Sequence, residues 1–179
     1  ITDHTRDIDR GAVQSQLWWR SIKNVTRHHA PGHFIPFFAF ERSHRDTDHN
    51  VISLRDDMLA NYPPPLPEFW ATITDADTIT IPHSTPNAKG TPFNGRIWDY
   101  QDDARRPLLE VYQGFRDTSS LAEAQVPLAK GYHIGLIASS DHLSTSASYA
   151  CVWTDEVERE AVFRSLQARR TFGATAPMR

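Results

Sequence analysis

The stretch that most constrains the fold of this chain runs from Gly131 to Thr145 and reads GYHIGLIASSDHLST. Its apolar half predicts a buried strand, which is followed by Asp141, His142 and a Ser/Thr-rich loop. In α/β proteins such a strand is a rigid support, and the polar residues at its C-terminal end reach a common site. We therefore expect a functional site here and ask which other residues converge on it.

The rest of the chain alternates between helix-like and strand-like patterns. Helix-like spacing of apolar residues falls at 12–28, at 68–74, at 120–130 and after the expected N-cap Thr154. Runs typical of buried strands fall at 34–40, 50–54, 78–82 and 108–114. The alternation predicts a single α/β domain over residues 1–179 with a largely parallel sheet.

Composition narrows the classes of protein to which the chain can belong. The net charge of −3 and the pI of about 6.3 provide no electrostatic footprint for nucleic acid or for an anionic membrane. The single cysteine, Cys151, excludes an internal disulfide framework and a thiolate-rich metal site. No apolar run reaches the length of a membrane span, and no signal peptide is recognised.

Residue types that bind metal ions stand at or next to the ends of the predicted strands. These residues are Asp3, His4, Glu41, His49, His83, Asp141 and His142. Because the C-terminal ends of parallel strands share one face, we expect these side chains to meet. Imidazole and carboxylate ligands without thiolate suit Zn, Mn or Fe(II). A single histidine is more often a hydrogen-bonded structural residue, so it is the repetition over several strands that favours a metal site.

Several segments also carry a resemblance to a known superfamily. The opening ITDH resembles the second motif of the polymerase-and-histidinol-phosphatase (PHP) metal-dependent hydrolases. One PHP branch, described as a domain of unknown function, is similar in order to PGHFIPFFAFERS, HNVISL, TITIPHS, PLLEVYQGFRD, GYHIGLIASSDHLSTSASYACVW and REAVFRSLQARRTFGAT. The resemblance covers nearly the whole chain and is most specific in SSDH followed by SYA and in the closing ARRTFGAT.

The resemblance implies a distorted β/α barrel with two or three divalent metal ions (Zn, Mn or Fe). Matched by motif, the metal ligands are His4, the bridging Glu41, His49, His83 and Asp141, and Asp3 is either a further ligand or a partner of one. Asp3 and His142 are the candidate catalytic residues. The superfamily's first motif, a His-x-His on the first strand, is missing. The implied barrel is therefore truncated at its N-terminus, and a separate N-terminal segment would complete it.

The last motif departs from the common superfamily pattern. Many members have Asp-x-His there, whereas this chain has Asp141 directly followed by His142. Neighbouring residues of a strand point to opposite faces, so both can serve one site only if the chain turns at Asp141.

The function implied is hydrolysis of a small-molecule phosphoester by a metal-activated water. Arg42, Arg96 and Arg116 are candidates for holding the substrate anion, although each is equally well explained as a surface ion pair. The loop 84–106 is either a substrate lid or a segment whose aromatic residues pack onto the barrel. The alternatives left open are a nuclease of the PHP type, a non-catalytic module with a partial metal site, and hydrolysis of a bond other than a phosphoester.

Overall fold

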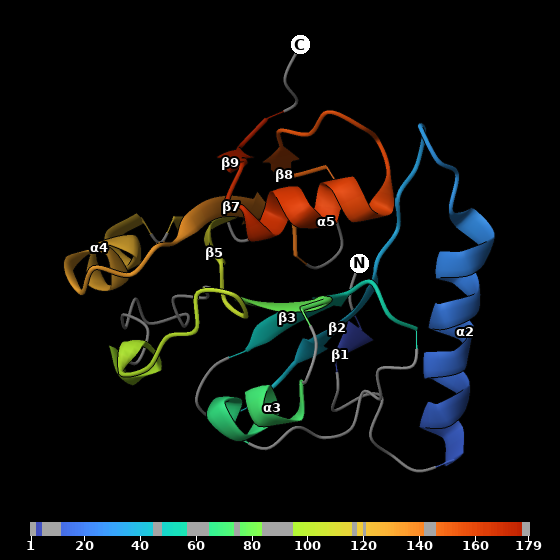
Figure 1. The fold of residues 1–179 in the computed structure, drawn as a ribbon, viewed down its shortest axis with the longest axis horizontal. Helices are drawn as coiled ribbons and strands as arrows, with labels where there is room; N and C mark the ends of the chain where they lie inside the picture. Colours follow the sequence, from blue (N-terminus) through green and yellow to red (C-terminus); the bar gives the residue numbers. More distant parts are fainter. Residues whose placement is uncertain are drawn as a thin grey trace.

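The described strands form three small sheets (Figure 1). The computed structural model describes residues 3–4, 12–44, 48–56, 65–73, 76–83, 95–115, 118–119, 121–141 and 146–176. The first sheet contains, in spatial order, β1 (Asp3–His4), β2 (Phe38–Arg42), β3 (His49–Ser53) and β4 (Thr78–Pro82). The second sheet has the order β6 (Thr118–Ser119), β5 (Leu108–Gln113) and β7 (Gly135–Ser139), and the third pairs β8 (Tyr149–Val152) with β9 (Thr171–Ala174). The helices are α2 (Ala12–His28), α3 (Leu66–Thr72), α4 (Leu121–Ala129), α5 (Arg159–Gln167) and the 3-10 helix η1 (Gly95–Trp98).

The predicted β/α barrel, with its largely parallel sheet, is wrong. Within the described residues only β1–β2 and β5–β7 are parallel pairs, and the sheets do not close into a barrel. Strands β2, β3 and β4 run antiparallel to one another. The segment 43–48 alone joins β2 to β3, whereas a parallel pair needs a crossover of about a dozen residues or more. The short connection therefore returns β3 beside β2.

Local elements were predicted better than their arrangement. The helix at 12–28 and the strand at 78–82 are confirmed with these bounds as α2 and β4. The predicted cap at Thr154 is wrong, because α5 begins at Arg159 and its N-cap is Glu158. Strand β9 was not predicted.

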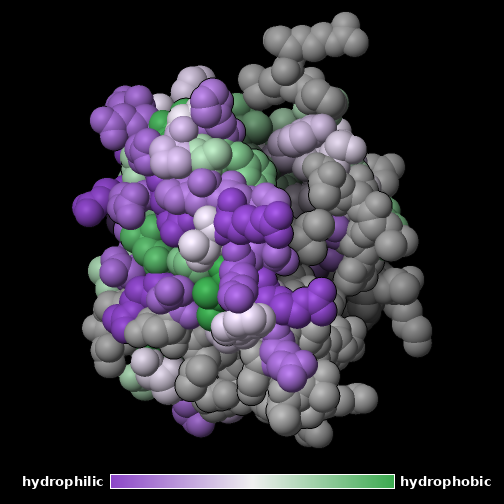
Figure 2. Space-filling view, turned by 90° about the vertical axis from the view of Figure 1, so that its right-hand side faces the viewer, coloured by the Kyte–Doolittle hydropathy of each residue, from purple (hydrophilic) through white to green (hydrophobic). Residues whose placement is uncertain are grey.

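Helix α2 lies along one side of the four-stranded sheet and is amphipathic (Figure 1). Its buried Trp18 meets Phe40 of β2 edge to face, with ring centroids 5.8 Å apart. Figure 2 shows the face of the molecule that includes α2 as mainly hydrophilic with small hydrophobic areas. No helix in the described part of the chain has the length and apolar character needed to cross a bilayer.

Two further hydrophobic clusters lie on the two faces of β5, and the first of them joins the sheets to one another. In the first of these, Phe163 and Leu166 of α5 pack with Ile79, Ile137 and other residues from β4, β5 and β7. In the second, η1 and α4 pack against the opposite face of β5. Strand β9 lies so close to β7 that a Cβ built on Gly173 would sit 2.8 Å from the Ala138 nitrogen. This packing holds the end of β7, and with it Asp141, next to the end of β4.

Candidate metal centre

The antiparallel meander β2–β3–β4 brings the end of β2, the start of β3 and the end of β4 to one edge of the sheet. Arg42 at the end of β2 pairs with His49 at the start of β3, and His49 pairs with Pro82 at the end of β4. Glu41 and His83 therefore lie at the same edge. For Glu41 and His83, the convergence that we expected from parallel strands is reached through antiparallel pairing instead.

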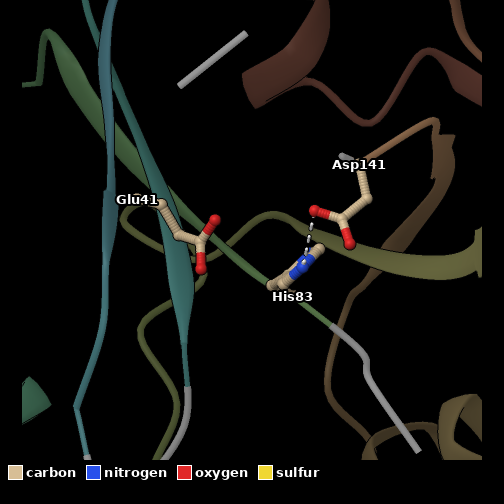
Figure 3. A group of neighbouring side chains, drawn as sticks. All are labelled: Glu41, His83 and Asp141. Carbon is tan, nitrogen blue, oxygen red and sulfur yellow. Dashed lines mark ion pairs between the residues drawn. The ribbon is translucent and has the colours of Figure 1, made fainter. Parts of the chain in front are cut away.

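Three of the predicted residues form one group at this edge: Glu41, His83 and Asp141 (Figure 3). One ligand atom from each lies within 4.8 Å of the others, and His83 Nε2 lies 3.6 Å from Asp141 Oδ1. Glu41 and His83 are buried, at 4% and 5% exposure. The group can hold a metal ion.

The backbone leaves the extended conformation at Asp141, the position at which the last motif needs a turn. Asp141 has a φ of 61°, in the left-handed region, two residues after the end of β7. Aspartate tolerates this conformation better than most residues, although it still costs free energy. The turn directs the Asp141 carboxylate toward His83 (Figure 3), and residues in such strained conformations cluster at functional sites.

A fourth buried side chain, Glu110 of β5, was not predicted. Its carboxylate lies 3.0 and 3.1 Å from His83 Nδ1 and accepts a hydrogen bond of 2.5 Å from the Ser139 hydroxyl. A carboxylate at Nδ1 fixes the tautomer that leaves the Nε2 lone pair for a metal ion. The signal that could have revealed Glu110 is its place inside the apolar run LLEVYQ, because a charged residue in a buried strand needs a partner.

The carboxylates strongly affect the protonation of the group. Burial raises the pKa of Glu41 from 4.5 to about 7, and the charge of His83 offsets part of this. Burial lowers the pKa of His83, but the hydrogen bond and charge of Glu110, together with the charges of Glu41 and Asp141, outweigh it and raise this pKa to about 9. The negative charges of three carboxylates thus surround one imidazole. They stabilise a positive charge at His83, either a proton on the ring or a metal ion.

The donor set fits a single divalent ion. One imidazole nitrogen and two carboxylates are ligands typical of Zn, Mn and Fe(II). Two ligand atoms bound to one ion at about 2.1 Å are separated by about 3.0–3.4 Å. The 3.6 Å between His83 Nε2 and Asp141 Oδ1 is close to this value, and the Glu41 oxygen, which lies within 4.8 Å of the other two ligand atoms, would move closer to bind the same ion.

Two of the predicted residues lie on the other face of the sheet. Directly paired residues share a face, and His49 pairs with Arg42, whose neighbour in the strand is Glu41. His49 and Arg42, both fully buried, therefore face away from Glu41. The structure does not bring His49 into the group with Glu41, His83 and Asp141, and it does not present Arg42 on a loop.

The remaining predicted residues have no described side chains. Asp3 and His4 form β1, where His4 is the parallel register partner of Glu41. Arg96 lies in η1. His142 and Arg116 lie outside the described residues. The roles of all five remain predictions.

Comparison of the chain with protein-family models, with curated proteins and with solved structures finds no match. The interpretation of the site therefore depends on its own geometry and chemistry.

Proposed function

We propose that this chain is a metal-dependent hydrolase that acts on phosphoester bonds. The observation that carries the proposal is the buried group Glu41, His83 and Asp141, whose ligand atoms lie within 4.8 Å of one another. A divalent ion held there would supply a water of lowered pKa and would stabilise the negative charge that develops on a phosphoryl group.

The residues of the chain prepare the group for such an ion. Glu110 orients the His83 ring and leaves Nε2 free of a proton when the imidazole is neutral. Glu41 and Asp141 offer oxygen atoms on two sides of this nitrogen (Figure 3). Ser139 donates to Glu110 and not to His83, so its hydroxyl is not placed as the nucleophile of a serine hydrolase.

A site with two or three Zn, Mn or Fe ions is the finer form of the proposal. His4 stands beside Glu41 in the sheet register, and His142 follows Asp141 in sequence. Both positions adjoin a residue of the group, as ligands of a second ion would. This form agrees with the resemblance of the sequence to the PHP hydrolases.

The second candidate function is a non-catalytic metal-binding module. It is favoured by the fact that, in the described part of the chain, ligands gather for one ion only. Such a module would bind the ion without turning over any ester.

The test separates these functions. Ion-free protein is loaded with Zn, Mn or Fe(II), its metal content is measured by plasma mass spectrometry, and hydrolysis of p-nitrophenyl phosphate and bis(p-nitrophenyl) phosphate is followed. We expect bound metal and hydrolysis in the unaltered chain, loss of both in Glu41→Gln and Asp141→Asn, and neither loss in Asp155→Asn, which alters an exposed carboxylate. Bound metal without hydrolysis would favour the non-catalytic metal-binding module. A chain that takes up no metal would overturn the proposal.

A further inference from the structure

A β-bulge in β5 changes which residues reach His83. The register of β5 against β7 shifts between Glu110, which pairs with Ile137, and Tyr112, which pairs with Ala138. Val111 is thus the extra residue. In a regular strand Glu110 and Gln113, three positions apart, would face opposite sides of the sheet.

The bulge places these two side chains on one face. Gln113 pairs with Ser139, and Glu110 pairs with Ile137 two positions earlier in β7, so both partners lie on the same side. The contacts agree, because Glu110 meets His83 Nδ1 while the Gln113 side-chain amide lies 3.0 Å from His83 Nε2. Bulges near active sites commonly redirect a side chain in this way.

The Gln113 amide occupies the direction that a metal ion needs. With Nδ1 held by Glu110, Nε2 faces the Gln113 amide in either protonation state: in the neutral ring its lone pair accepts from the amide N–H, and in the imidazolium, which the raised pKa of about 9 favours near neutral pH, Nε2–H donates to the amide oxygen. A lone pair that accepts a hydrogen bond cannot bind an ion at the same time. A glutamine also serves both protonation states of the ring, because its oxygen accepts from the imidazolium N–H when the amide turns over.

We propose that Gln113 is a positioning residue that competes with the metal ion for His83 Nε2. It holds the ring in place in the ion-free protein and is displaced when an ion binds. Its effect is to weaken and tune metal affinity, so the two hydrogen-bond partners of His83 act in opposite directions: Glu110 strengthens metal binding, and Gln113 opposes it. The inference depends on the proposed metal site.

The test is titration calorimetry of Zn into ion-free protein. Gln113→Met keeps the length of the side chain and removes the hydrogen bond, so we expect the Zn dissociation constant to fall about three- to tenfold, the value of one neutral hydrogen bond. Gln113→Asn, whose amide is too short to reach, should shift the constant in the same direction and covers the case in which the methionine variant fails to fold. Gln167→Met is the matched control, because Gln167 donates to the Ala76 carbonyl instead of to the site, and its Zn affinity should be unchanged.

A second measurement reports the bond itself. Long-range proton–nitrogen NMR of the His83 ring should show an Nε2 shift that differs between the unaltered chain and Gln113→Met in the ion-free state and agrees between them in the Zn-bound state. Unchanged Zn affinity in a folded Gln113 variant would overturn the inference and leave the metal site in place. Weaker affinity would also overturn it, since the amide would then be a ligand. Failure of the unaltered chain to bind Zn would overturn both proposals.

Discussion

Two buried polar clusters of this molecule each centre on one nitrogen-bearing side chain, and they differ in where the positive charge comes from. At Arg106, which is fully buried, the guanidinium donates to Gln101 Oε1 and to the carbonyls of Ile97 and Tyr100. It also lies 4.4 Å from the ring centre of Trp98. At His83 the neighbours include the carboxylates of Glu41, Glu110 and Asp141.

The difference separates a structural cluster from a candidate functional one. The cation of Arg106 is part of the chain, so nothing can replace it. Its hydrogen bonds hold the segment 97–101, and its guanidinium lies over the rings of Trp70, Trp98 and Tyr100. Around His83 the anionic groups are part of the chain and the cation can exchange, as a proton or as a metal ion. Of the two alternatives for loop 84–106, the packing of Trp98 and Tyr100 in this cluster favours a structural role for its C-terminal part.

The largest effect should come from removing the built-in cation. Arg106→Met leaves buried oxygen atoms without their donor, so we expect the free energy of unfolding to fall by about 3 kcal/mol or more. Arg106→Lys should lose less, because it keeps the charge and loses the planar fork. Urea denaturation measures both, and Arg164→Met, on the exposed side of α5, is the control. Zn affinity of the folded Arg106 variants should be unchanged, and a loss of affinity would mean that the two clusters are coupled.

The exchangeable cation should make the stability of the ion-free protein depend on pH. Glu41 has a folded pKa of about 7, above its ordinary 4.5, so its contribution is present below about pH 4.5 and is lost as pH rises through 7. His83 has a folded pKa of about 9, above 6.5, so its contribution is present below about pH 6.5 and is lost as pH rises through 9.

Both shifts have the same sign, so the free energy of unfolding should fall by a few kcal/mol, in order of magnitude, between about pH 4.5 and pH 9. Urea midpoints measured across this range in the presence of a chelator check it. In Glu41→Gln the part of the decrease between about pH 4.5 and 7 should disappear. A midpoint that rises over the whole range would contradict the carboxylate-rich description of the site.

The smallest of these effects concerns the orientation of His83. Glu110→Gln removes the charge that holds Nδ1–H, and we expect the Zn dissociation constant to rise about 10- to 100-fold. Competition of the protein with a chromophoric chelator measures it, with the exposed Glu160→Gln of α5 as control. An unchanged constant would show that the Glu110 contact is structural, like those of Arg106.

Much of the local structure could be predicted, because the signals for it are local. The spacing of Trp18, Ile22 and Val25 predicts α2, and the β-branched run TITIP predicts β4. Strand β9 was missed because it pairs with β8 and packs against β7, and both strands are distant from it in sequence. The barrel was wrong for a related reason. Alternating elements do not reveal whether neighbouring strands run parallel, and here the short 43–48 segment decides it.

By itself the sequence determined which residue types stand at the strand ends, and three of them, Glu41, His83 and Asp141, meet in the structure. Only the tertiary structure decided the rest of the site. It turned His49 and Arg42 to the other face, and it brought Glu110 and Gln113 to His83 through the bulge at Val111. The physical reason is that the face to which a side chain points depends on the register of its strand. One extra residue shifts the register and reverses that face, and the register is specified by the partner strand rather than by neighbouring residues.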